Sequence, residues 1–322
     1  MNRIAVMSHT LCDLHQPGLG HPENPARVKV ILDSLATLGG EVVDIQDEIL
    51  LSSEGDVLGA LKWIHDPAYI ERVRSLCKEA PTHVDTTDCL VCSASWDALV
   101  ASAGLSLRAA LDLAGGKFRR AFVVARPPSH HAEKDRARGY CFFNGVALAA
   151  EVLARASGGP VVVVDIDAHH GNGTQRHFWE RADIGYISVH EYPAFPGSGG
   201  ADEVGDGPGR NTTRNVPLAA GADDAIVASA LEGALEDVVS RLRPVALVVS
   251  AGFAGHRDDP VSGLKMTEVG FSRMTRAIVQ ASEAWSDGRV LSILEGGYEP
   301  KSLAASARAH VEALAQQGTV VN

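Results

Sequence analysis

The sequence has no apolar stretch long enough to cross a membrane, and the N-terminal segment MNRIAVMSHT has too short an apolar run for a signal peptide. It also lacks low-complexity segments, internal repeats and any linker between domains. We therefore expect one domain over residues 1–322, in the cytoplasm and without a membrane partner.

Positive charge is in deficit, because 29 lysines and arginines stand against 40 aspartates and glutamates, which gives a formal net charge of −11. This balance argues against nonspecific binding to nucleic acid, since such binding needs a basic surface. It is compatible with cationic substrates. Arginine outnumbers lysine and alanine is abundant, which indicates a GC-rich bacterial gene.

Cysteine is sparse, with five residues scattered along the chain. Cys89 and Cys92 form a CxxC motif, but no second pair accompanies it, so the motif is weak as a metal site. We expect all five to be free thiols in a reducing compartment.

The most informative stretch that is present is Val161–Thr174, VVVVDIDAHHGNGT. Its four valines predict a strand buried on both faces, and Asp165, Asp167, His169 and His170 follow directly. Such groups are costly to desolvate unless they bind something. Asp167 and His169 are two residues apart and project to the same side in extended backbone, and carboxylate plus imidazole suits Zn²⁺ in a hydrolytic site. The alternative is a polar loop with satisfied hydrogen bonds.

Strands and helices are predicted to alternate along most of the chain, which indicates an α/β fold with a parallel sheet and helices on both faces. The predicted strands are Arg3–Met7, Ala121–Ala125, Val161–Val164, Ile184–Val189, Val245–Val249 and Val290–Leu294. The predicted helices are Ala26–Leu38, Pro67–Cys77 after an Asp66 N-cap, Ser93–Ala114, Gly145–Ala156, a helix from an Asp223 cap to Leu242, Thr267–Ser286 and Lys301–Gln316.

Four polar clusters follow four of these strands: Arg126–His131, Asp165–His170, Ser250–Asp259 and Glu295–Tyr298. In open α/β sheets the ligand sits outside the carboxyl ends of the strands. We therefore expect the four clusters to converge on one active site.

The adjacent histidines His130 and His131 point in different directions, so each needs its own partner, and together they are candidates for acid–base chemistry. Asp165 is a candidate to orient one ring and Asn172 the other. An aspartate partner keeps an imidazole more basic than an amide does, so the pKa values of the two rings should differ.

Aromatic residues near the same loops are the next candidates. Tyr298, on the turn after Gly296 and Gly297, has a phenol that would stabilise a tetrahedral oxyanion. Tyr140 and Phe195 have glycine close by and are interpreted as walls of a channel. Phe142 and Phe143, at the start of a helix, are interpreted as core residues.

Six segments in this order resemble the histone deacetylase superfamily, specifically its class II and bacterial deacetylase-like amidohydrolase branch with acetylpolyamine amidohydrolase relatives. They are HPENPAR (21–27), RPPSHHAE (126–133), GYCFFNGVA (139–147), DIDAHHGNGTQ (165–175), SAGFAGHRDDP (250–260) and LEGGY (294–298). The resemblance covers nearly the whole chain and implies the fold shared by arginases and deacetylases.

The resemblance implies that Asp167 and His169 are zinc ligands. It implies that His131 is the general base and acid, that His130 is its electrostatic partner and that Tyr298 stabilises the transition state. The remaining catalytic positions are the histidine partners, Asp165 and Asn172; Asn172 in place of aspartate points to class II.

The resemblance also implies a substrate site. Gly139, Tyr140 and Phe195 match the tunnel for the acyl-lysine chain, and Arg27 matches the arginine of an acetate-release channel. A structural potassium ion is implied near Asp165, Asp167, His169, Ser188 and Val189.

One departure is serious, because the third zinc ligand of the family is an aspartate at a position that is Ala254 here. A hydrolytic zinc site needs three protein ligands plus water, so two ligands predict weak binding and a poorly activated water. His256 is not an obvious substitute. Either the chain is a naturally impaired member, or an aspartate was replaced in the laboratory to trap substrate; because the other catalytic positions are intact, we favour the replacement.

We expect a zinc-dependent deacetylase acting on an acylated lysine peptide or protein, impaired in the chain as given. A first alternative is deacetylation of an acetylated polyamine or another small amine, although Val261 lies where a polyamine-selective relative has an acidic gatekeeper. A second is an inactive acyl-lysine binding protein. Manganese arginases share the fold but need more carboxylates, and an oligomer is compatible with all of these readings.

Overall fold

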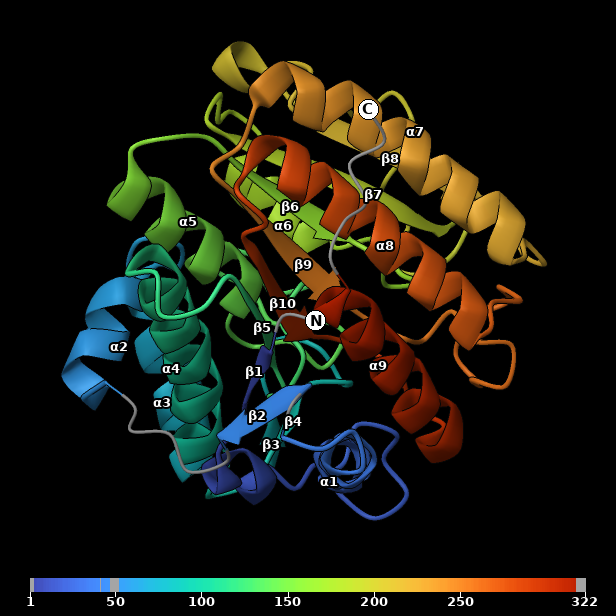
Figure 1. Cartoon of the computed structure of the whole chain (residues 1–322). Coiled ribbons are helices and arrows are strands. Elements are labelled where there is room, and N and C mark those ends of the chain that lie inside the picture. Colours follow the sequence, from blue (N-terminus) through green and yellow to red (C-terminus); the bar gives the residue numbers. More distant parts are fainter. Residues whose placement is uncertain (1–2, 41, 47–51, 317–322) are drawn as a thin grey trace.

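The computed structural model describes residues 3–40, 42–46 and 52–316, and these form one large parallel sheet with helices on both sides (Figure 1). Its strand order is β2-β1-β5-β10-β9-β6-β7-β8, and every neighbouring pair is parallel. The strands are β1 (Ile4–Met7), β2 (Val43–Gln46), β5 (Arg120–Val123), β6 (Val161–Asp165), β7 (Ile184–Glu191), β8 (Thr213–Leu218), β9 (Ala246–Ala251) and β10 (Val290–Leu294). The predicted α/β architecture is confirmed.

Helices cover the two faces in separate groups (Figure 1). Helices α1 (Ala26–Ala36), α7 (Asp224–Leu242), α8 (Glu268–Trp285) and α9 (Pro300–Ala315) lie on one face. Helices α2 (Glu54–Leu61), α3 (Pro67–Lys78), α4 (Ser95–Ala114), α5 (Gly145–Ser157) and the short α6 (Asn172–Phe178) lie on the other. No helix among the described residues is long and apolar enough to span a membrane.

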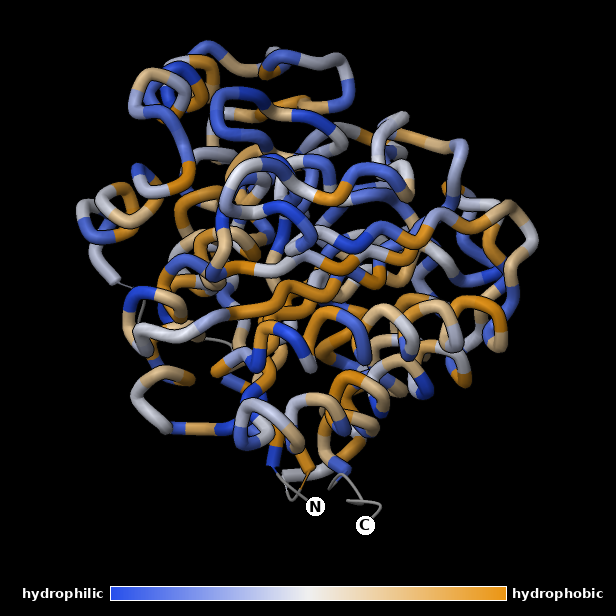
Figure 2. Tube along the Cα trace, turned by 90° about the horizontal axis from the view of Figure 1, so that it is seen from above, coloured by the Kyte–Doolittle hydropathy of each residue, from blue (hydrophilic) through white to orange (hydrophobic). Residues whose placement is uncertain are grey.

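The valine run explains why β6 sits inside the sheet. Val161 and Val163 belong to the hydrophobic cluster under α4 and α5, whereas Val162 and Val164 belong to the cluster under α7 and α8. All four are fully buried, because successive side chains of a strand point to opposite faces and both faces are covered. Figure 2 shows hydrophobic segments concentrated in the middle of the molecule.

The predicted helix boundaries agree with the structure to within two residues. The side chain of Asp223 caps α7 by accepting from the backbone N–H groups of Ala225 and Ile226. Asp66 is the N-cap residue of α3, as predicted, but its carboxylate makes no capping bond and pairs with Lys134 at 3.1 Å.

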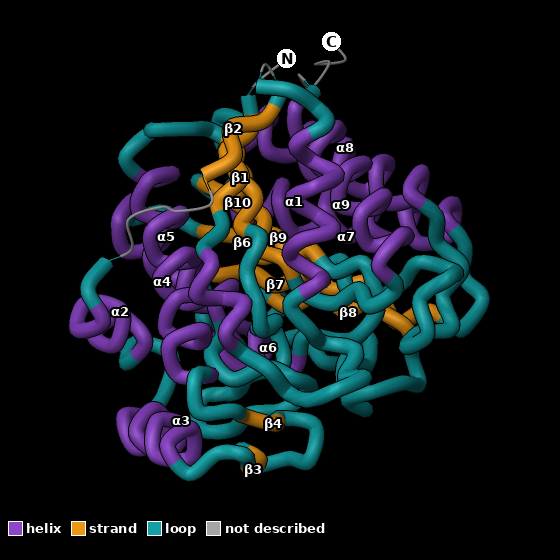
Figure 3. The backbone as a smooth tube through the Cα atoms, turned by 90° about the horizontal axis from the view of Figure 1, so that it is seen from below, coloured by secondary structure: helices purple, strands orange, loops and turns teal. Residues whose placement is uncertain are grey.

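Several elements have no counterpart in the prediction: β2, α2, α6, β8 and the small hairpin of β3 (Thr82–His83) and β4 (Leu90–Val91). Strand β8 lies at the edge of the sheet, contains Pro217 and exposes Arg214, so it has no continuous apolar run. The loops and the β3–β4 hairpin gather at one end of the sheet (Figure 3).

Candidate active site

A pocket of about 210 Å³ lies at the carboxyl end of the sheet, lined by Asp88, His131, Gly139, Tyr140, His169, Phe195, Val261 and Tyr298. Apart from Asp88, these residues follow five neighbouring strands: β5, β10, β9, β6 and β7. Three of the four predicted polar clusters contribute a lining residue, and the fourth, Ser250–Asp259, reaches the site through the contact of Asp259 with the Tyr298 backbone. A larger cavity between α2, α4 and α5, of about 770 Å³, has Trp63 and Leu111 in its wall but no histidine.

Gly139 forms a wall of the pocket that only glycine fits. Its φ is +58°, a left-handed conformation that side chains disfavour. A Cβ at this position would collide with the imidazole of His131 and lie 3.1 Å from Cε1 of Phe195. The backbone at residue 139 therefore packs directly against the ring of His131.

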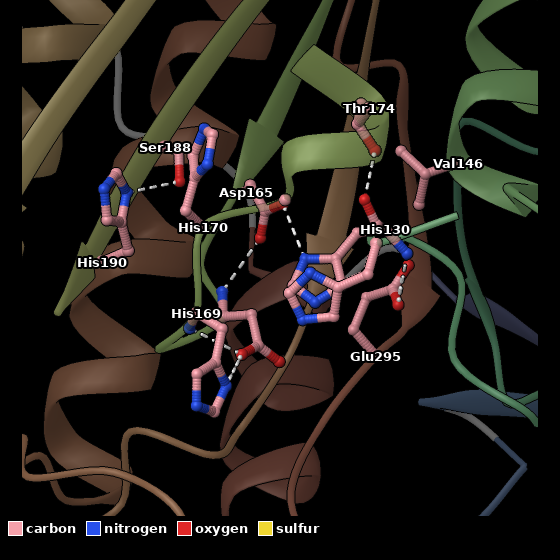
Figure 4. A network of polar contacts seen from close by, with 12 residues as sticks. His130, Val146, Asp165, His169, His170, Thr174, Ser188, His190 and Glu295 are labelled. Carbon is pink, nitrogen blue, oxygen red and sulfur yellow. Dashed lines mark hydrogen bonds and ion pairs between the residues drawn. The ribbon is translucent and has the colours of Figure 1, made fainter. Parts of the chain in front are cut away.

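His130 has an acidic environment. Its Nδ1 lies 3.0 Å from Oδ2 of Asp165, and its backbone N–H donates to Glu295 (Figure 4). Burial alone would lower the pKa of His130, but the carboxylates of Asp165 and Glu295 outweigh it and raise this pKa to about 10. His130 is therefore a positive charge behind the pocket.

His131 faces the pocket and has a neutral partner. Its Nδ1 lies 2.9 Å from Oδ1 of Asn172, and its ring packs edge-on against Phe195. Burial, then the positive charges of His130 and His169, lower the pKa of His131 well below its usual value. The two rings thus differ in pKa in the predicted direction, and His131 is the neutral one.

Glu295 supports both histidines from behind. Its carboxylate accepts from the Ser129 backbone N–H at 2.5 Å, the Ser129 hydroxyl at 2.5 Å and the His130 backbone N–H at 3.0 Å. Burial raises the pKa of Glu295 to about 7, although the charge of His130 opposes the rise. The hydroxyl of Ser129 therefore has a structural role in fixing the His130–His131 segment.

Asp167 and His169 lie on the same side of the segment after β6, but that segment is bent and not extended as the prediction assumed. Oδ1 of Asp167 is 3.3 Å from Nδ1 of His169 and accepts from the backbone N–H of His169 at 2.9 Å. Oδ2 accepts from the backbone N–H of Gly296 at 2.9 Å. Burial would raise the pKa of Asp167, but hydrogen bonds from His169 and the charge of His130 lower it below the usual range. Asp167 is therefore a carboxylate ready to ligate a cation.

Ala254 leaves this pair without a third donor. Its methyl group is fully buried, and an ideal Cβ on Gly296 would lie 3.3 Å from it and 2.6 Å from Oδ2 of Asp167, so both side chains approach the same point. His256 does not replace the missing group, since its ring lies 3.7 Å from Asp258 and 3.6 Å from Glu268.

Among the described residues no group of three or more His, Cys, Asp or Glu side chains is arranged to hold a metal. The donor set therefore does not fit a three-ligand catalytic zinc site, although a carboxylate at position 254 would complete one.

Tyr298 is anchored through its backbone. Its N–H donates to Oδ2 of Asp259 at 2.6 Å, and that carboxylate also accepts from the N–H of Glu299. The Tyr298 ring packs edge-on against Tyr140 at a centroid distance of 5.8 Å. The buried Asp259 thus holds the phenol at the pocket wall.

Arg27 does not line the pocket. It is buried behind Tyr298, with its guanidinium carbon 4.9 Å from the centre of that ring, and it donates from Nε to the carbonyl of Gly297 at 2.7 Å. It also pairs with Glu23 at 3.3 Å. In this structure Arg27 braces the turn that carries Tyr298.

Of the residues implied for potassium, Asp167 and His169 lie at the pocket, whereas Ser188 lies on the side of Asp165 that faces away from His130 (Figure 4). Asp165 on β6 is paired in register with Ser188 on β7, and Val189 follows in the buried part of β7. The hydroxyl of Ser188 contacts Nδ1 of His190 at 2.9 Å. His170 is turned away from the pocket, toward Ser198 and Gln175.

Four acidic or phenolic side chains at the site had no individual role in the prediction, although Glu295 belongs to the predicted cluster Glu295–Tyr298. Asp88 lines the pocket and accepts from the Gly139 backbone N–H at 2.9 Å, Tyr186 donates to Asp165 at 3.2 Å, and Glu133 accepts from Asn172 at 2.8 Å. Glu295 is the fourth. Glu133 and Glu295 lie next to predicted residues in the segments HHAE and LEGGY, so their position in the sequence could have identified them as candidate site residues. Asp88 has no motif around it.

Comparison with known proteins agrees with this geometry. Residues 21–314 match the family described as Histone deacetylase domain. Histone deacetylase 15 of Arabidopsis thaliana is 34% identical over 301 residues, which cover 91% of this chain and 52% of that protein, so the chain spans about half the length of this relative.

A bacterial relative matches over most of its length. Acetylpolyamine amidohydrolase 2 of Pseudomonas aeruginosa is 34% identical over 314 residues, which cover 88% of this chain and 89% of that protein. The crystal structure of the HDA15 HD domain superposes with a TM-score of 0.89 at 32% identity, covering 100% of this chain and 92% of that one. The family match, the fold and the six segments agree, and the chain belongs to the histone deacetylase family.

Proposed function

We propose that this protein is an amidohydrolase that removes acyl groups, chiefly acetyl, from amines such as the lysine side chain. The observation that supports it is the pocket itself. His131 and Tyr298 face the same narrow space as His169, between the aromatic walls Tyr140 and Phe195. A flat acyl amide on a slender alkyl chain is the substrate that such a pocket fits.

The roles follow from the environments of the side chains. His131 is neutral and is the group that accepts a proton from water and later delivers it to the leaving amine. Tyr298 is the hydrogen-bond donor for the oxyanion that forms at the carbonyl. His130, charged beside Asp165, stabilises developing negative charge by its field.

The proposal includes zinc as the metal of the family, with Asp167, His169 and an aspartate at position 254 as its ligands. When bound, zinc would polarise the carbonyl and activate water. Because residue 254 is alanine here, the chain as given should be nearly inactive. A structural potassium ion near Asp165 and Ser188 is a further part of the proposal.

Two other functions have specific support. The similarity to an acetylpolyamine amidohydrolase favours an acetylated polyamine or another small amine as substrate. Ala254 favours an inactive protein that binds acyl-lysine without cleaving it. Sequencing the source gene would separate a natural alanine from a replaced aspartate. In every case we propose a cytoplasmic protein without nucleic-acid or membrane partners.

The test is a substrate panel on the Ala254→Asp protein loaded with zinc. Acetyl-lysine peptides, longer acyl-lysine peptides and acetylated polyamines are compared by the amine released, with the chain as given as the matched control. Activity on acetyl-lysine supports the first proposal, and preference for acetylpolyamines supports the second. A folded, zinc-loaded Ala254→Asp protein that cleaves no acylated amine would leave only the binding function.

A further inference from the structure

Glu133 lies on the side of Asn172 opposite His131. The Asn172 side chain has three contacts. Its Oδ1 lies 2.9 Å from Nδ1 of His131, and its Nδ2 donates to Oε1 of Glu133 at 2.8 Å and, at the longer distance of 3.5 Å, to the backbone carbonyl of His131. Asn172 is the first residue of α6 and is buried, whereas 22% of the Glu133 side chain is exposed. The three side chains therefore form a chain of hydrogen bonds that runs from the pocket to solvent.

The direction of this chain of hydrogen bonds is set at the Glu133 end. An ionised carboxylate only accepts hydrogen bonds, so it requires the NH₂ group of the Asn172 amide. The carbonyl oxygen of that amide then faces His131, and a carbonyl oxygen also only accepts. His131 must therefore carry its proton on Nδ1, which leaves the lone pair on Nε2.

We propose that Glu133 is a positioning residue that fixes the tautomer of His131 through Asn172. The Asn172 amide alone does not select a tautomer. In one orientation its carbonyl oxygen faces His131 and accepts a hydrogen bond, and in the flipped orientation its NH₂ group faces His131 and donates one. The carboxylate removes this freedom. The inference rests on the proposed function only for its effect on rate, since Nε2 is the atom that a base at this position would use.

Basic side chains lie on the solvent side of Glu133. Arg176 lies 3.7 Å from its second oxygen, and the side chain borders a polar cavity of about 830 Å³ whose wall also includes Arg138. The charged ring of His130 also lies close to His131, with 4.0 Å between the two ring centroids. This positive charge opposes the binding of a second proton to His131. The His131 ring is therefore neutral and has two possible tautomers, and Glu133 determines which of the two it adopts.

The first measurement is the ring ¹⁵N spectrum of the chain as given, labelled at histidine and recorded at mildly basic pH, with His131 assigned from a His131→Gln sample. Protonated and unprotonated ring nitrogens differ in shift and coupling, so the tautomer is read directly. We expect the proton on Nδ1 alone. A proton on Nε2 would overturn the proposal, and this result does not depend on metal or activity.

Two substitutions test the cause. Glu133→Gln keeps the size but lets the side chain either accept or donate, so the Nε2–H tautomer should appear. Adding Asn172→Asp restores a single direction, because the glutamine NH₂ then donates to the new carboxylate, so every neutral His131 ring should carry its proton on Nδ1. An aspartate partner also makes the imidazole more basic, so this spectrum is recorded above the pH at which the ring takes up a second proton. Glu180→Gln, which removes a carboxylate from the same cavity without touching Asn172, should leave the spectrum unchanged.

In the Ala254→Asp background Glu133→Gln should lower kcat about 10- to 100-fold with KM little changed, the usual range for a partner one step removed from the chemistry. The paired substitution should recover most of this loss. An unchanged tautomer in Glu133→Gln refutes the inference even if the enzyme is active. An inactive Ala254→Asp protein with the expected tautomers refutes the proposed function and leaves this inference standing.

Discussion

Replacing Ala254 by aspartate should make the stability of the protein depend on zinc. The new carboxylate would enter a site with no solvent exposure, beside Asp167 and close to Gly296. Without metal it would be an unpaired buried charge near a second carboxylate. Such a charge costs about 3–5 kcal/mol, so in chelator the Ala254→Asp protein should be less stable than the chain as given by an amount of this order.

Zinc should offset this loss and bring the two proteins to similar stability. A ligand that binds only the folded state stabilises it by about 4 kcal/mol at a thousand times its Kd. At ~2 °C for each kcal/mol in a chain of this size, the Tm of Ala254→Asp should rise by about 8 °C between chelator and saturating zinc. The chain as given, with Asp167 and His169 alone, should gain little at the same zinc concentration.

The assay is thermal unfolding in chelator and in a zinc series, followed by metal analysis after dialysis. Ala254→Asn is the matched control, because it has nearly the size of aspartate without the charge and should show neither the loss in chelator nor the full gain in zinc. Stoichiometric, chelator-resistant zinc in the chain as given would refute the reasoning. So would an Ala254→Asp protein whose Tm does not respond to zinc.

The remaining predictions concern the two histidines, the tyrosine and the core. In the zinc-loaded Ala254→Asp protein, His131→Ala should nearly abolish kcat and His130→Ala should reduce it less; the opposite order would contradict the assignment of His131 as the base. Tyr298→Phe should lower kcat roughly 10²–10³-fold, or about 3–4 kcal/mol, with zinc content unchanged, and a change of only a few-fold would remove the oxyanion role. Burial lowers the pKa of His310 to about 3, whereas its value in the unfolded state is 6.5. Between these two pH values only the unfolded state takes up the proton, so the free energy of unfolding decreases as the pH is lowered. His310→Gln should therefore reduce the slope of unfolding free energy against pH between about pH 6 and 4 by about 1.4 kcal/mol per pH unit, measured by denaturant titration.

The sequence predicted those parts of the fold in which a local residue pattern is compatible with a single structural environment. The Val161–Val164 run reads as a strand covered on both faces, and helices stand on both faces of β6. Asp223 before an apolar helical pattern predicted a cap that the structure contains. These patterns involve residues close together in the sequence, so they can be interpreted without knowing how the rest of the chain folds.

The parts that were missed depend on neighbours far away in the sequence. Strand β8 is half exposed at the sheet edge and takes its register from β7, so its own residues carry no apolar run. Asp88 reaches the pocket because it holds the backbone of Gly139, 51 residues later. The resemblance associated Arg27 with an acetate-release channel, and that role stays a prediction. The structure shows Arg27 behind Tyr298, held by the carbonyls of the turn after β10, contacts that no local pattern predicts.

The contact between Gly139 and His131 has a consequence for how substrate range can change. On that side the pocket wall is main chain, and any side chain at residue 139 would displace the imidazole. Widening or narrowing the pocket there would change the acid–base group with it. The half-exposed Phe195 packs against His131 and is coupled to it in the same way. Variation in acyl-chain length, by natural drift or by engineering, is therefore easiest at other side chains of the wall, such as the partly exposed Val261.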